Sequence, residues 1–203
     1  MGLNDLERYI PLLKAYIADT ACRMTREPSG RLTHPYIVPC APDSPYYSAT
    51  LWDWDSWLTG IFLGQLESDS GRPGDFIECE RGSVLSFLSL CTEEGVMPIC
   101  AKPDGDLRPG YPGRALTNMH KPVLAQQAAA LVQRDGGRTD WIAPHFPQLR
   151  AFLSCYLTKH RNADTGLMYW QDDFAVGVDN DPSVFYRPAA SCGSVFLNSL
   201  MVR

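Results

Sequence analysis

Tryptophan and aspartate alternate in the short stretch LWDWDSW, residues 51–57. An indole ring offers a flat apolar face that matches the apolar face of a sugar ring, and a neighbouring carboxylate can accept hydrogen bonds from sugar hydroxyls. Trp52, Trp54 and Asp55 are therefore candidate carbohydrate-binding residues. The alternative interpretation is that Trp54 and the third tryptophan are core residues, while Asp53 or Asp55 caps a helix.

A second stretch, GLMYWQDDFAVGVDNDPSVFYRP at residues 166–188, again mixes aromatic and acidic side chains. Such a mixture suits carbohydrate binding. The alternatives are a solvated acidic loop or a calcium site, because carboxylate and amide oxygens at residues 179–181 are suitable calcium ligands. The spacing is not that of an EF-hand, so we expect no metal site. The residues of this stretch that we single out are Trp170, Asp179, Asn180 and Arg187.

A third stretch, NMHKPVLAQQAA at residues 118–129, places polar residues at the start of an expected helix. The N-terminus of a helix favours anions and polar ligands, which makes Lys121 and Gln126 candidate binding residues. The alternative is that Lys121 is solvated and that Gln126 is an ordinary surface residue. The sequence contains no HExxH, P-loop or GxGxxG pattern that would favour a different chemistry, and we expect no cofactor.

Composition limits the class of protein. The chain has 203 residues, 45% of them hydrophobic, and a formal net charge of -5 without a basic patch, so nucleic acid is not an expected partner. No apolar run is long enough for a membrane span, and the N-terminus lacks the apolar core of a secretory signal. The seven cysteines are scattered without a C-x-x-C pair, which favours reduced, mostly buried thiols in the cytoplasm.

Apolar periodicity predicts six helices in one domain that covers residues 1–203. They are expected at about 3–21, 54–67, 75–91, 122–134 and 144–158, and from 191 to the end. Asp75 and Glu78 have the spacing of a capping box, and Pro122 is expected in the first turn of its helix. A short extended pair is expected near residues 97–101. Long loops at 27–48, 93–120 and 164–188 connect these elements.

The alternation of helices with long loops predicts an all-α fold of the (α/α)6 toroid type. In such a toroid alternate helices form an inner and an outer ring, and the long loops gather at one end, where a pocket forms. A plain helical bundle is the alternative, although it explains the long loops less well.

Four short motifs in the same order resemble the catalytic domain shared by glycoside hydrolase families 37 and 63. These families include trehalases, processing α-glucosidases and mannosylglycerate hydrolase-like enzymes. The motifs are WDSW at 54–57, KPVLA at 121–125, GVDNDP at 177–182 and LNSL at 197–200. Each motif is modest alone, but four in register are fairly specific, and they cover the chain after about residue 45.

The resemblance implies an inverting glycoside hydrolase that acts on an α-linked di- or oligosaccharide or a glycosyl-glycerate-type substrate. It implies that Asp179 is the general acid and that Trp54 and Asp55 hold the sugar at the cleaved bond. Two departures put the sugar in doubt. Ala175 and Val176 stand where the families often have Glu-Ser, and Asp181 stands where they usually have Ser.

Six helices occupy 203 residues, so a full toroid would need about twice that length. We therefore expect the chain to supply half of the ring without the general base, and to have negligible hydrolytic activity alone. The alternative is a noncatalytic carbohydrate-binding half-toroid. A lyase or epimerase on the same architecture, using His34, His120 or His145, is a third possibility. Half a ring would expose apolar helix faces, which favours self-association.

Overall fold

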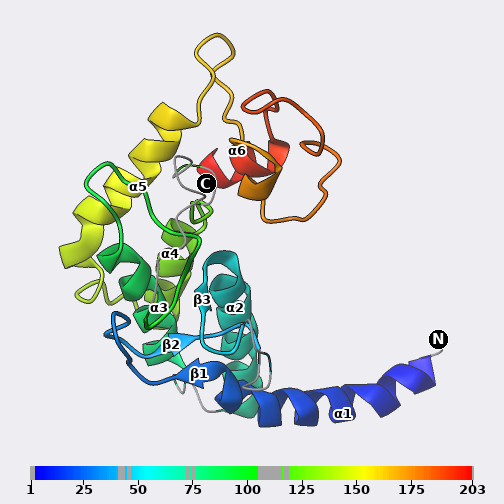
Figure 1. Ribbon diagram of the computed structural model, residues 1–203. Helices are drawn as coiled ribbons and strands as arrows, with labels where there is room; N and C mark the ends of the chain where they lie inside the picture. The colour runs from blue at the N-terminus through cyan, green and yellow to red at the C-terminus, as the bar shows by residue number, and fades with distance from the viewer. Residues whose placement is uncertain are drawn as a thin grey trace.

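The computed structural model describes residues 3–40, 44, 47–71, 74, 76–104, 116 and 119–202, with the side chains of residues 3–6 excepted. The described chain is mainly α-helical, about half of it in helices, with little sheet (Figure 1). The α-helices are α1 (Leu3–Ala21), α2 (Asp53–Ser70), α3 (Ile77–Ser89), α4 (Leu124–Arg134), α5 (Phe146–Lys159) and α6 (Val195–Val202). The 3-10 turns are η1 (Cys22–Met24), η2 (Ala143–His145) and η3 (Asp173–Ala175).

Two short antiparallel pairs join segments that are distant in the sequence. Strand β1 (Thr25–Arg26) pairs with β2 (Tyr36–Ile37), and β3 (Leu51–Trp52) pairs with β4 (Cys100–Ala101). The extended segment near residues 97–101 therefore pairs with the residues that precede α2 rather than within itself. This pairing places the start of α2 against the loop that leads to α4.

Helix α3 supports the β1–β2 pair. Gly82 permits the close approach, because a Cβ atom there would overlap the carbonyl oxygen of Pro35. The next residue, Ser83, accepts a hydrogen bond from the backbone N–H of Ile37 at 3.0 Å. The expected loop at 27–48 is therefore partly core: its buried apolar residues are Leu32, Tyr36, Ile37 and Val38.

The main core lies between α3, α4 and α5 and the segments that lead into them. Phe87 of α3, Leu124 and Leu131 of α4, and Phe152 of α5 are all buried there. All seven cysteines are free, but only Cys100 and Cys155 are buried, so the prediction of mostly buried thiols is wrong.

Helix α1 projects away from the rest of the molecule (Figure 1). Its apolar residues have helical spacing, as expected, but that spacing does not lead to burial. The large apolar side chains that are exposed on it are Tyr9, Ile10, Leu12, Leu13 and Tyr16. A surface ion pair between Lys14 and Asp69, 2.9 Å long, connects α1 to the end of α2.

Several predicted helix ends are displaced for local reasons. Helix α2 continues to Ser70 because the left-handed cap that ends it is Gly71, with φ of 67°. Helix α4 begins after Pro122, since that proline lies in a turn and the N–H of Val123 bonds to the carbonyl of Lys121 at 2.7 Å. Helix α6 begins at Val195, because a β-bridge between Tyr169 and Gly193 keeps the preceding chain extended.

Two further ends differ from the sequence prediction. Pro144 lies in η2 and α5 begins at Phe146, whose ring is exposed rather than on the buried face. Helix α3 spans Ile77–Ser89, and its first residue follows Phe76 without a side-chain cap. The expected capping residue Asp75 lies outside the described part of the chain. No helix among the described residues combines the length and apolarity needed to cross a membrane.

Candidate functional site

Helix α2 begins directly after a strand, and this junction orients its first turn. Trp52 is the N-cap residue and makes no capping hydrogen bond, while the N–H of Asp53 donates to the carbonyl of Ile99 at 3.0 Å. The interpretation that Asp53 or Asp55 caps the helix is therefore wrong. Instead, Asp53 bonds to the segment that precedes α4, whereas the Asp55 carboxyl group interacts with its own backbone N–H.

Asp53 and Lys121 form a fully buried pair. One oxygen of Asp53, Oδ2, accepts a hydrogen bond from the backbone N–H of Lys121 at 2.9 Å and lies 3.5 Å from its Nζ. Both side chains are 0% exposed, so the interpretation of Lys121 as a solvated residue is wrong. Among the described residues, Asp53 Oδ1 and Lys121 Nζ have no hydrogen-bond partner. A buried charge held in this way keeps a strong field in the surrounding space.

The ammonium of Lys121 also faces two parts of the predicted sugar site. Its Nζ lies 5.9 Å from the centre of the Trp54 ring, which is within cation–π range. Gly177 approaches from the loop after α5: a Cβ atom there would lie 2.7 Å from Lys121 Nζ and 3.6 Å from the Trp54 ring. Glycine is favoured at this position for two reasons: its φ is 79°, and a side chain would overlap that of Lys121. We call Asp53, Trp54, Asp55, Lys121 and Gly177 the helix-start cluster.

Asp55 is half-buried one turn into α2. Burial raises the pKa of its carboxyl group, and the nearby charge of Asp53 raises it further. The Lys121 ammonium acts in the opposite direction but does not reverse the shift. Asp55 is thus easier to protonate than an exposed aspartate.

The loop that carries Asp179 is strained. Among the described non-glycine residues, positive φ values occur only at Asn180, Tyr186 and Ala190, all within this loop. Such conformations cost about 1–3 kcal/mol each and cluster at functional sites. Asp179 itself is exposed to solvent. The next carboxylate, Asp181, accepts a hydrogen bond from the N–H of Ser183 at 2.8 Å and so closes a local turn.

Aromatic rings connect the helix-start cluster to α6. The Trp54 ring lies 6.4 Å from that of Phe196, which lies 6.1 Å from that of Trp170. Trp170 is only 2% exposed, so it is a core residue in this conformation rather than an open surface. Asn198 of the LNSL motif holds this segment by bonding both the N–H and the carbonyl of Met168, at 3.0 and 2.8 Å.

The remaining predicted residues lie around this cluster in different settings. Trp52 is half-buried and its ring lies 5.5 Å from that of Tyr47. Gln126 donates from Nε2 to the carbonyl of Leu200 at 3.0 Å and thereby joins α4 to α6. Arg187 and Asn180 are exposed on the strained loop.

His120 is closed off from solvent. Its ring packs edge-on against Phe87 at 4.4 Å and against Phe152 at 5.7 Å, and its Nδ1 lies 2.6 Å from the carbonyl of Lys121. Burial lowers the pKa of the imidazole, so His120 is neutral near pH 7. These contacts give it a structural role beside Lys121.

Two cavities lie along the inner faces of α2, α4 and α6. The first, of about 730 Å³, lies between α2 and α4, and the second, of about 710 Å³, lies beside α6. Trp57 borders both, and Gln126 borders the second. Trp54 and Asp179 line neither of these two cavities. The described structure therefore brings the Gly177 segment to Trp54 and Lys121 without enclosing Asp179.

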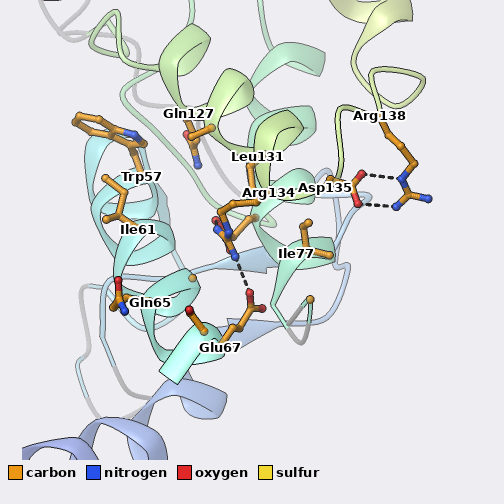
Figure 2. Close-up of a pocket in the computed structure, with 15 residues that line it drawn as sticks. Trp57, Ile61, Gln65, Glu67, Ile77, Gln127, Leu131, Arg134, Asp135 and Arg138 are labelled. Atoms are coloured by element: carbon orange, nitrogen blue, oxygen red, sulfur yellow. Dashed lines mark hydrogen bonds and ion pairs between the residues drawn. The ribbon is translucent and has the colours of Figure 1, made fainter. Parts of the chain in front are cut away.

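The first cavity exposes a charged group that sequence reasoning missed (Figure 2). Arg134 Nη1 bonds both carboxylate oxygens of Glu80 at 2.8 Å, and its Nη2 bonds Glu67 at 2.6 Å. We call Glu67, Glu80 and Arg134 the carboxylate–guanidinium cluster. Burial raises the pKa of Glu80 to about 7. The available signal was weak: Glu67 and Glu80 occur within apolar helix patterns, which is typical of buried acids with a partner.

Metal and family comparisons add little to this geometry. The described residues contain no group of three or more His, Cys, Asp or Glu side chains arranged to hold a metal ion. No protein-family model matches the sequence, and no curated protein matches it.

Proposed function

We propose that the chain binds a saccharide at the helix-start cluster, and that Asp179 is the general acid of an inverting glycoside hydrolase site. The observation that carries this proposal is the close approach of Gly177 to Lys121 and Trp54, where an added Cβ atom would lie 2.7 and 3.6 Å from their side chains. Asp179 follows two residues later, so its Cα atom lies within about 12 Å of the indole. The proposal brings the aromatic face of Trp54 and the carboxylates of Asp55 and Asp179 together around one saccharide.

In the proposed reaction the proton of the Asp179 carboxyl group moves to the glycosidic oxygen as the bond to the anomeric carbon breaks. A water molecule attacks the opposite face of that carbon and loses a proton to a second carboxylate. Trp54 supports the apolar face of the ring, and Asp55 bonds its hydroxyls. We assign no residue to the role of general base.

The same proposal includes the (α/α)6 toroid, with α2, α4 and α6 as inner helices and α3 and α5 as outer helices. It is supported by the packing of alternate helices: α2 contacts α4, and α3 contacts α5. It is also supported by the Gln126 hydrogen bond from α4 to α6. In a toroid the starts of the inner helices face one end of the ring, so the proposal places the helix-start cluster at that end.

A noncatalytic saccharide-binding domain is the second candidate. A general acid must hold its proton near neutral pH, which usually requires a partly apolar, shielded pocket. The exposure of Asp179 favours the noncatalytic alternative. The two candidates share the binding site and differ only in whether Asp179 donates a proton.

Calorimetric titration with methyl α-glucoside, methyl α-mannoside and trehalose tests the binding site. We expect Trp54→Ala to weaken binding about tenfold, because it removes the stacking surface. Trp141→Ala, which removes an indole from the segment between α4 and α5, is the matched control and should bind normally. Equal affinities together with equal numbers of binding sites for the wild-type chain and Trp54→Ala would overturn the proposal.

Azide rescue separates the catalytic candidate from the noncatalytic one. Azide attacks an anomeric carbon without needing a base, so a chain that has the acid but lacks the base should convert an α-glycoside to the β-glycosyl azide. Asp179→Asn should abolish this product, whereas Asp164→Asn, an exposed change of the same type, should not. Normal binding with no azide product would favour the noncatalytic domain.

We also propose self-association through the apolar residues that α1 exposes. A double change, Leu12→Lys with Tyr16→Lys, should reduce the apparent mass in sedimentation experiments while leaving the helical circular dichroism unchanged. A wild-type chain that sediments as a monomer at all concentrations would contradict this.

A further inference from the structure

The cavity between α2 and α4 is separate from the helix-start cluster. It follows the later turns of both helices, from Trp57 to Ser68 on α2 and from Gln127 to Arg134 on α4 (Figure 2). Gly64, which lines it, lies about 15 Å along the helix axis from Trp54, and Trp57 at its near end lies about 4.5 Å from Trp54 along the same axis. Its volume of about 730 Å³ is that of a small-molecule site.

Gln127 supplies an unsatisfied polar group to this cavity. Its side chain is 3% exposed, and among the described residues neither its Oε1 nor its Nε2 has a hydrogen-bond partner. A buried amide without partners costs about 1–3 kcal/mol for each unsatisfied group. The cost is recovered when a bound molecule offers both a donor and an acceptor to the amide.

The charged groups of the cavity are already paired with one another. Arg134 is bound to Glu67 and Glu80, while Asp135 forms ion pairs with Arg81 and Arg138. Three carboxylates of the lining thus face two guanidinium groups of the lining and that of Arg81 behind them. A charged ligand would have to separate one of these pairs, whereas a neutral ligand would not. Arg134 still has N–H groups beyond those that its two glutamates use.

One wall of the cavity is apolar. The Trp57 indole and Ile61 of α2 face Leu131 of α4 across the opening (Figure 2). A flat indole, an amide that both donates and accepts, and a half-exposed guanidinium form a set that suits a ring bearing several hydroxyl groups.

We propose that this cavity is a second saccharide site, which binds a neutral hexose unit between Trp57 and Gln127. Adjacent ring hydroxyls bond the Gln127 amide, one as donor and one as acceptor, and the apolar ring face lies on the indole. This site uses no residue of the helix-start cluster, so it stands or falls independently of the proposed glycosidase function.

Nitrogen-15 NMR of the full chain, titrated with methyl α-glucoside and trehalose, tests the site. We expect the Trp57 indole and Gln127 amide signals to shift in a saturable way. Gln127→Leu, which keeps the size of the side chain, should weaken this binding about tenfold. Trp54→Ala should leave it unchanged, which distinguishes this site from the helix-start cluster.

A second variant covers the possibility that Gln127→Leu does not fold. Ala130 is exposed on α4 and lines the cavity, so Ala130→Phe should block it without altering the core. Glucose 6-phosphate is the charged comparison and should bind more weakly than glucose. The proposal is overturned if the Trp57 and Gln127 signals do not shift, if either variant binds like the wild type, or if the phosphate sugar binds more tightly.

Discussion

Charged side chains are buried at both ends of the contact between α2 and the segment 121–134, which includes α4, but the two ends differ in how the charges are paired. At the helix-start cluster one carboxylate faces one ammonium at 3.5 Å, and both are 0% exposed. At the carboxylate–guanidinium cluster two carboxylates share one guanidinium, which remains 30% exposed beside an open cavity. The first pair is enclosed by backbone and aromatic rings, whereas the second can exchange its partners with water.

This difference in enclosure determines how each charge pair responds when one partner is removed. An enclosed, incompletely bonded pair holds a fixed field near Trp54 and Gly177, and removing either partner leaves a charge that water cannot reach. A pair beside a cavity can relax when a partner is lost. The comparison therefore predicts unequal responses to matched substitutions.

The largest expected effect is at the enclosed end. Lys121→Met should lower the free energy of unfolding by about 3–5 kcal/mol, because it leaves Asp53 buried without a counter-charge. Urea denaturation monitored by circular dichroism measures the change. Lys14→Met, which removes an exposed ion pair, is the control and should cost less than about 1 kcal/mol. Similar losses for the two variants would remove the basis of the comparison.

At the open end, Arg134→Met should cost less, about 2–3 kcal/mol at pH 8. Glu80 already has a pKa of about 7, above its ordinary value near 4.5, and loss of the guanidinium raises that pKa further. A carboxyl group with a raised folded-state pKa destabilises the fold as pH increases. The cost should therefore shrink when the same denaturation is done at pH 5. A pH-independent cost would contradict the raised pKa of Glu80.

Proton linkage offers a third test, because two buried groups act in opposite directions. Burial lowers the pKa of His160 to about 4 from an ordinary value near 6.5. The fold therefore loses stability as pH falls from 6.5 towards 4, by about 2.5 kcal/mol at pH 4.5. Protonation of Glu80 stabilises the fold over much of this range and so offsets part of the loss caused by His160.

Substitution should separate these two contributions. His160→Phe keeps an aromatic ring beside Tyr156 and should be more stable at pH 4.5 than at pH 7. Glu80→Gln should be less stable at pH 4.5 than at pH 7. Denaturation at a series of pH values measures both variants, and parallel profiles for the two would contradict the assignment of opposite signs.

The smallest effects are expected for two glycines: Gly177 in the helix-start cluster and Gly64 beside the carboxylate–guanidinium cluster. Gly177→Ala should cost about 1–2 kcal/mol, since φ is 79° and the new Cβ would meet the buried Lys121 side chain. Gly64→Ala should cost less than about 1 kcal/mol: its Cβ would meet the movable end of Arg134, and alanine favours the helix. Thermal unfolding compares the two, and a larger loss for Gly64→Ala would reverse the comparison.

The sequence predicted the features that depend on neighbouring residues and missed those that depend on contacts between distant residues. Helical periodicity located α1 through α5 to within a few residues, because it reports local burial within one element. The ends were displaced where a distant contact decided them, as at Pro122, where Lys121 is held by Asp53. The β3–β4 pair was half predicted, since an extended segment does not reveal its partner.

The sequence by itself determined the mainly helical content and the presence of aromatic and acidic side chains next to one another, because these depend on neighbouring residues. Only the tertiary structure decided that Lys121 is buried against Asp53, that Gly177 lies against Trp54, and that Glu67 and Glu80 share Arg134. These contacts join residues tens of positions apart, and no local pattern encodes which charges will meet once water has been excluded between two helices.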